Sequence, residues 1–156
     1  MTVWYLHGLE SKAGGAKVDF LYSKADKVYA PEMDYNHPEM FTSLLRLAKY
    51  NKPDLIIGSS MGGYFADALG SHLDVEVLLF NPALHSRTIE PEGVTYGESN
   101  WKRNFVVGND DKVIDPKATL VYKDLVKSYT EVKGMGHRTF LSVFMDIYTK
   151  WETNQL

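Results

Sequence analysis

Two adjacent serines lie in a stretch of small residues that could present a nucleophile. Residues 58–64 read Gly-Ser-Ser-Met-Gly-Gly-Tyr and follow an apolar run. In a sharp strand-to-helix elbow, the nucleophile needs small residues two positions before and two positions after it, so that strand and helix can approach each other. Centring the elbow on Ser60 puts Gly58 and Gly62 there, whereas centring it on Ser59 puts an isoleucine and a methionine there. The spacing predicts Ser60 as the nucleophile and Ser59 as a small spacer.

A serine hydroxyl is a poor nucleophile at neutral pH and needs a base within hydrogen-bond reach. His137 is the candidate base, because Gly134 and Gly136 would let its loop bring the imidazole over the elbow. The acid that would orient this imidazole comes from the pair Asp110 and Asp111. The other four histidines fit the role of base less well, since they are expected in turns, near helix ends or in a long connection: His7, His37, His72 and His85.

An oxyanion formed during acyl transfer needs two backbone N–H donors. One should come from the residue after the nucleophile, Met61. The other should come from the loop after the first strand, where the His-Gly pair at 7–8 places Leu9. A helix that begins at the elbow would add the positive end of its dipole. We therefore expect an oxyanion hole formed by the amides of Leu9 and Met61.

Short apolar runs alternate with helical patterns, which predicts parallel strands joined by helices. The expected strands are residues 3–6, 27–30, 55–57, 75–80, 105–107 and 129–132. Apolar residues at helical spacing mark 41–48 and 140–151, a helix should follow the elbow over 64–69, and Asp115 with Pro116 should begin another. The predicted fold is a three-layer α/β/α sandwich with a mostly parallel sheet of about six strands. Ligands bind at the carboxyl ends of such strands, where the candidate serine, aspartates and histidine all lie.

The composition excludes several classes of protein. The 156 residues suit one domain over 1–156, with a net charge of −3 and no basic stripe for nucleic acid. No run approaches the ~18 apolar residues of a membrane span, and the N-terminus does not read as a signal peptide. There are no cysteines for disulfides or zinc, and no glycine-rich nucleotide motif follows a strand. We expect a soluble, cytoplasmic protein that acts on a small molecule without a metal or cofactor.

Five segments, spread from the first strand to the last helix, resemble the α/β-hydrolase superfamily and, more narrowly, its small bacterial YqiA-like esterases. They read YLHG, GSSMGGYFA, NPA, GNDDKVID and GMGHRTF. The order serine, acid, histidine is that of the superfamily's triad. The resemblance implies hydrolysis of esters or thioesters of short acyl groups by Ser60, Asp111 and His137, without a cofactor. Asp111 is preferred to Asp110 because it fits the superfamily pattern Gly-x-x-Asp-x-Val, in which Val113 would pack under the loop.

The chain departs from the full superfamily pattern in two ways. It starts directly at the strand before the His-Gly turn, so the first hairpin of larger members is missing, and residues 83–102 are too few for a cap domain. The missing hairpin would expose a sheet edge, which leaves a homo-oligomer open. Two other functions also stay open: the same triad acting on amides or peptides, and a non-catalytic hydrolase fold that only binds.

Overall fold

Six short strands form one parallel sheet in the order β2-β1-β3-β4-β5-β6. The computed structural model describes all residues, 1–156. The strands are β1 (Thr2–Leu6), β2 (Lys27–Tyr29), β3 (Leu55–Ser59), β4 (Val77–Phe80), β5 (Arg103–Gly108) and β6 (Ser128–Val132). All six predicted strands are present, and the sheet is parallel throughout.

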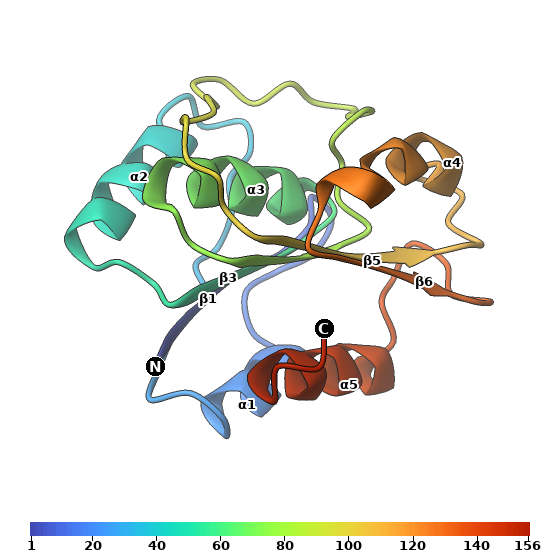
Figure 1. Cartoon of the computed structure of the whole chain (residues 1–156). Helices are drawn as coiled ribbons and strands as arrows, with labels where there is room; N and C mark the ends of the chain where they lie inside the picture. The colour runs from blue at the N-terminus through green and yellow to red at the C-terminus, as the bar shows by residue number, and fades with distance from the viewer.

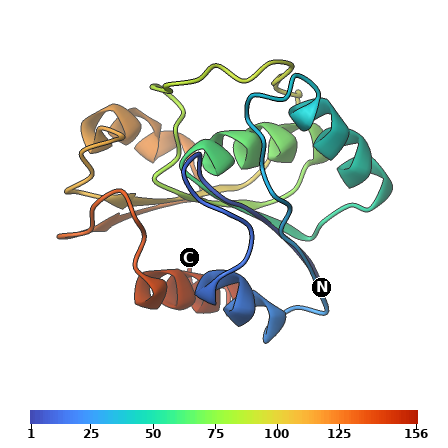
Figure 2. The ribbon, with the colours of Figure 1, turned by 180° about the vertical axis from the view of Figure 1, so that it is seen from behind.

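Helices cover both faces of this sheet (Figure 1). One layer holds α2 (Met40–Tyr50), α3 (Met61–Leu73) and α4 (Pro116–Thr119), which continues into the 3-10 helix η1 (Leu120–Leu125). The other layer holds α1 (Ala16–Tyr22) and α5 (Leu141–Glu152), which lie side by side in both views (Figure 2). The predicted three-layer α/β/α sandwich is therefore confirmed. No helix has both the length and the apolar character that crossing a membrane requires.

Alternate residues of each strand face two separate apolar cores. In β1, Trp4 faces the core shared with α2 and α3, whereas Val3 and Tyr5 face the core shared with α1 and α5. The central strands β3 and β4 follow the same alternation, with every residue from 55 to 58 and from 77 to 80 buried. Because both faces are covered, these strands read in the sequence as continuous apolar runs rather than as an alternation of apolar and polar residues.

Helix α1 is not among the helices predicted from the sequence. It is only seven residues long, its N-cap Gly15 makes no side-chain cap, and only Val18 and Leu21 are buried. Such a short helix is marginal by itself and is stabilised by packing, here against α5. At the other end of that layer, Phe140 does not belong to the buried stripe of α5, because it precedes the helix and is 51% exposed.

The connection between β4 and β5 forms no helix or strand over residues 81–102, as the sequence predicts. It runs over the α3 side of the sheet (yellow-green in Figure 1). The buried carboxylate of Asp67 on α3 anchors it by accepting hydrogen bonds from Tyr96 Oη at 3.0 Å and Trp101 Nε1 at 2.9 Å. The Arg103 guanidinium lies 3.9 Å from the same carboxylate. The Asp67 side chain therefore ties the second half of this connection to α3, through Tyr96 and Trp101.

Candidate active site

Ser60 occupies a strained backbone position between β3 and α3. Its φ of 54° and ψ of −117° place it in a region that residues other than glycine rarely adopt. The two flanking glycines are sterically required. A Cβ on Gly58 would lie 2.7 Å from Ala66 Cβ, and a Cβ on Gly62 would lie 2.7 Å from His7 O. The predicted elbow is therefore present, centred on Ser60, and Ser59 is the last residue of β3.

Three side chains from distant parts of the sequence form one hydrogen-bonded chain at this elbow. Ser60 Oγ lies 3.0 Å from His137 Nε2, and His137 Nδ1 lies 2.9 Å from Asp111 Oδ2. Ser60 and His137 are partly exposed, whereas the Asp111 side chain is fully buried. In this arrangement the carboxylate accepts the Nδ1 proton, which leaves Nε2 free to accept the serine proton. The geometry can generate a nucleophile at Ser60.

The structure brings Asp111, and not Asp110, to the histidine. Asp111 Oδ1 accepts the amides of Val113 at 2.8 Å and Ile114 at 3.0 Å, which leaves Oδ2 for the imidazole. Asp110 points to solvent and pairs with Lys112 at 2.7 Å. The expectation that Val113 packs under the loop is wrong, because Val113 is 63% exposed and Ile114 is buried instead. Two successive amides turned toward one carboxylate oxygen wrap the chain around Asp111 and direct the Val113 side chain outward.

The amides predicted for the oxyanion hole lie on either side of the elbow. Ser11 N donates to Gly8 O at 3.2 Å, which closes a turn with Leu9 as its second residue. A Cβ on Gly8 would lie 3.3 Å from Ser60 Cβ, so this turn passes directly against the nucleophile. Met61 is the first residue of α3, and its amide has no partner within the helix. No hydrogen bond to another protein group occupies the Leu9 or Met61 amide.

His7 holds the turn that carries Leu9. The Met33 amide lies 2.9 Å from Nε2 of its buried ring, Glu32 Oε1 lies 3.2 Å from the same nitrogen, and Nδ1 lies 2.7 Å from Gly8 O. Tyr35 Oη donates to His7 O. His7 therefore holds backbone groups of this turn and of the Met33 segment, and it does not reach Ser60 as a base would. Burial raises the pKa of the Tyr35 hydroxyl well above its usual range, which keeps it a donor.

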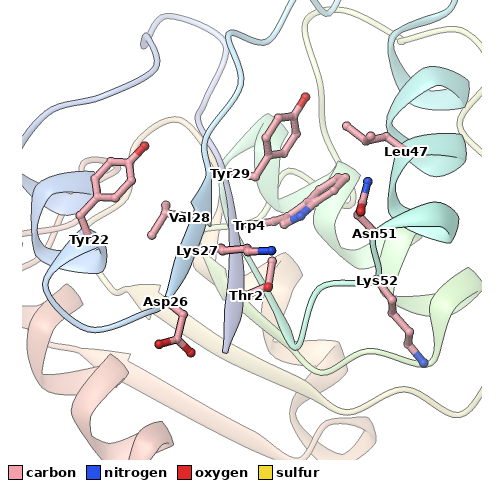
Figure 3. A pocket seen from close by; sticks show the side chains of 10 residues that line it. All are labelled: Thr2, Trp4, Tyr22, Asp26, Lys27, Val28, Tyr29, Leu47, Asn51 and Lys52. Carbon is pink, nitrogen blue, oxygen red and sulfur yellow. The ribbon is translucent and has the colours of Figure 1, made fainter.

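One cavity lies away from this cluster. It has a volume of about 600 Å³, follows the edge strand β2, and contains none of the three side chains above. Its lining is shown in Figure 3: Thr2, Trp4, Tyr22, Asp26, Lys27, Val28, Tyr29, Leu47, Asn51 and Lys52. No three histidine or carboxylate side chains converge as a metal site would require. The elbow, and not this cavity, therefore carries the reactive groups.

The sheet order and the elbow define an α/β-hydrolase fold. Residues 2–118 match the model of UPF0227, an uncharacterised protein family, and the chain belongs to this family. The expected resemblance to the α/β-hydrolase superfamily and its YqiA-like members is confirmed. The chain matches none of the curated proteins with which it was compared.

Solved structures share this fold at low sequence identity. An α/β hydrolase from a sediment metagenome of the Mar Chica lagoon superposes with a TM-score of 0.76 and 15% identity, covering 99% of this chain and 91% of that chain. Monoacylglycerol lipase from Paleococcus ferrophilus gives 0.74 and 14%, covering 99% and 95%. Est1E from Butyrivibrio proteoclasticus gives 0.73 and 13%, covering 99% and 87%.

Proposed function

We propose that this protein is a serine hydrolase that cleaves carboxylic esters or thioesters of small acyl groups through an acyl-enzyme. The observation that carries the proposal is the unbroken chain from Ser60 Oγ through the His137 imidazole to the buried Asp111 carboxylate, with links of 3.0 and 2.9 Å. The strained elbow beneath Ser60 supports it, because proteins retain such strain mainly at functional sites. A lipase is among the structures that share the fold, which is consistent with ester chemistry.

The mechanism follows from the positions of these groups. His137 takes the Ser60 proton as Ser60 Oγ attacks the carbonyl carbon, and Asp111 stabilises the imidazolium that forms. The Leu9 and Met61 amides receive the negative charge on the former carbonyl oxygen. His137 then returns the proton to the leaving alcohol or thiol, and the acyl group stays on Ser60. Water, activated by the same imidazole, attacks the acyl-enzyme and releases the acid.

A small acyl group suits the surroundings of Ser60. No inserted domain covers the elbow, because residues 81–102 form no helix or strand. The first residues of that connection lie directly against the nucleophile, where Ala83 N donates to Ser60 O at 3.0 Å. On the opposite side, the turn at Gly8 passes against Ser60 Cβ. Two loops therefore bound the site, and no inserted domain is present to enclose a long acyl chain.

Hydrolysis of p-nitrophenyl acetate, butyrate and octanoate tests the proposal. We expect the wild type to turn over with a preference for the shorter esters. Ser60→Ala should lose essentially all activity, because removing the nucleophile of a complete triad costs roughly 10⁶-fold in kcat. Ser59→Ala is the matched control, since its side chain lies one position before the elbow, and it should stay within a few-fold of wild type.

Assays with thioester and peptide substrates distinguish the remaining candidate functions. If Ser60-dependent cleavage is faster for peptides than for esters, the protein is an amidase rather than an esterase. If wild type and Ser60→Ala are equally slow on all three classes of substrate, the hydrolase proposal is wrong and a binding function of the fold takes its place.

A further inference from the structure

Asn81 joins the end of one strand to the loop that carries His137. The sequence marks it as the residue that ends a strand and as the first of the NPA segment, without a role for its side chain; in the structure it is 1% exposed and directly follows β4. Its φ of 44° lies in the left-handed region, which asparagine tolerates better than most residues. This conformation turns its side chain away from the strand direction and toward the neighbouring loops.

The side-chain amide of Asn81 makes three hydrogen bonds, all with backbone groups. Its Oδ1 accepts the amide of Gly108, the last residue of β5, at 2.8 Å. Its Nδ2 donates to Gly136 O at 3.1 Å and to His137 O at 2.8 Å. Only one orientation of the amide satisfies a backbone donor on one side and two carbonyls on the other.

These contacts hold two successive backbone carbonyls at His137. No backbone N–H donates to the carbonyl of Gly136 or His137, so Asn81 is their only hydrogen-bond partner in the protein. The preceding part of the loop is tied separately, by Asp110 N to Met135 O at 3.1 Å. Asn81 also belongs to the segment that supports the nucleophile, because Ser60 N donates to Phe80 O at 2.9 Å.

We propose that Asn81 is a positioning residue, which holds the His137 backbone at the distance from the elbow that lets its imidazole bridge Ser60 and Asp111. The expected effect on turnover rests on the proposed function. The expected effect on the position of the His137 ring rests on the geometry alone. A displacement of about 1 Å in a catalytic group can cost 100-fold in rate, so one neutral amide at this point can control turnover without touching substrate.

Asn81→Asp is the sharpest test. The substitution keeps the size, the tolerance for a left-handed φ and the acceptor for Gly108 N, but it replaces both donors by an oxygen that faces two carbonyls. We expect kcat on p-nitrophenyl acetate to fall by about 100-fold with KM within a few-fold. The acid limb of the pH–rate profile should move to higher pH, because the new charge next to the loop favours the imidazolium form of His137.

Asn104→Asp is the matched control. Asn104 is equally buried and has the same pattern of contacts at the other end of β5, with Nδ2 donating to Glu76 and Val77 O and Oδ1 accepting from Ser128. Asn104→Asp should lower stability but leave kcat per folded molecule and the pH profile unchanged. If Asn81→Asp does not fold, Asn81→Gly removes the same donors while accommodating the left-handed φ.

A proton NMR spectrum separates this inference from the proposed function. The low-field resonance of the His137 Nδ1 proton, which is hydrogen-bonded to Asp111, reports the position of the ring whether or not the protein turns over. We expect it to shift or disappear in the Asn81 variants and to stay in Asn104→Asp. An unchanged resonance in a folded Asn81 variant, or unchanged kcat and pH profile, would overturn the positioning role. Loss of the resonance in a protein without Ser60-dependent hydrolysis would support the inference and refute the function.

Discussion

Asp110 and Asp111 are neighbouring aspartates with opposite surroundings. The Asp111 side chain is fully buried and accepts two backbone amides and the His137 ring, whereas the Asp110 side chain is 61% exposed and pairs with a lysine. A buried carboxylate needs such partners, because burying an unpaired charge is very costly. The imidazole of His137 is therefore one of the groups that stabilise Asp111 in the folded protein, as well as the group that Asp111 orients.

Asp111→Asn should reduce kcat by about 10⁴-fold and leave KM within a few-fold. The asparagine oxygen can still accept the Val113 and Ile114 amides, so the loop should keep its shape. Its NH₂ group would instead face Nδ1 and favour the tautomer with a proton on Nε2, which cannot accept the serine proton. Steady-state kinetics on p-nitrophenyl acetate measure the effect.

Asp110→Asn is the control for this experiment and should stay within a few-fold of wild type. Equal losses in both variants would contradict the assignment of the acid to Asp111.

At the level of elements, a buried carboxylate of α3 is one of the groups that hold the connection over residues 81–102. Burial raises the pKa of Asp67, and this effect outweighs the Arg103 charge and the hydrogen bonds from Trp101 and Tyr96, which lower it. The folded protein therefore holds a proton on Asp67 at a higher pH than the unfolded chain does. The resulting stabilisation is complete below the unfolded-state pKa and is lost as the pH rises through the folded-state pKa.

Comparison of wild type with Asp67→Asn isolates this effect, since asparagine does not titrate. The free energy of unfolding of wild type minus that of the variant should fall as the pH rises from about 4 toward neutrality. Urea denaturation from pH 4 to 8 at constant salt measures it. A difference that grows with pH for Asp67→Asn would contradict the raised pKa.

For the molecule as a whole, the apolar cores on the two faces of the sheet differ in size. The core shared with α2 and α3 has 19 buried residues, and the core shared with α1 and α5 has 13. In the smaller core, the ring of Phe144 on α5 contacts those of Tyr5, Phe20 and Phe80, with centroids 5.9, 6.2 and 5.2 Å away. One side chain therefore joins α5 to β1, α1 and β4.

Phe144→Ala should lower the free energy of unfolding by about 3–5 kcal/mol, a large part of the total stability of a domain of this size. The cause is the lost apolar burial together with the cavity left among the three remaining rings. Phe140→Ala should cost less than about 1 kcal/mol, because that ring is half exposed just before the same helix. Urea denaturation at neutral pH compares them, and similar losses would mean that α5 does not depend on this cluster.

The sequence was sufficient for the strands, the elbow and the order of the candidate groups, because each depends on local patterns. The requirement for glycines two residues before and after Ser60 can be predicted without a structure, because it comes from the steric crowding of one turn. Other features could not be predicted from the sequence. Helix α1 forms through packing on α5, and the outward turn of Val113 follows from amides that bind Asp111.

By itself, then, the sequence determined the fold class and which residues stand at the carboxyl ends of the strands. Only the tertiary structure decided which of them meet. The hydrogen bond from Ser60 to His137 spans 77 positions, and that from His137 to Asp111 spans 26. Contacts over such separations depend on how strands order in the sheet and how loops close over them. The three bonds of Asn81 belong to the same class, which is why a residue that reads as a strand end proves to hold the histidine loop.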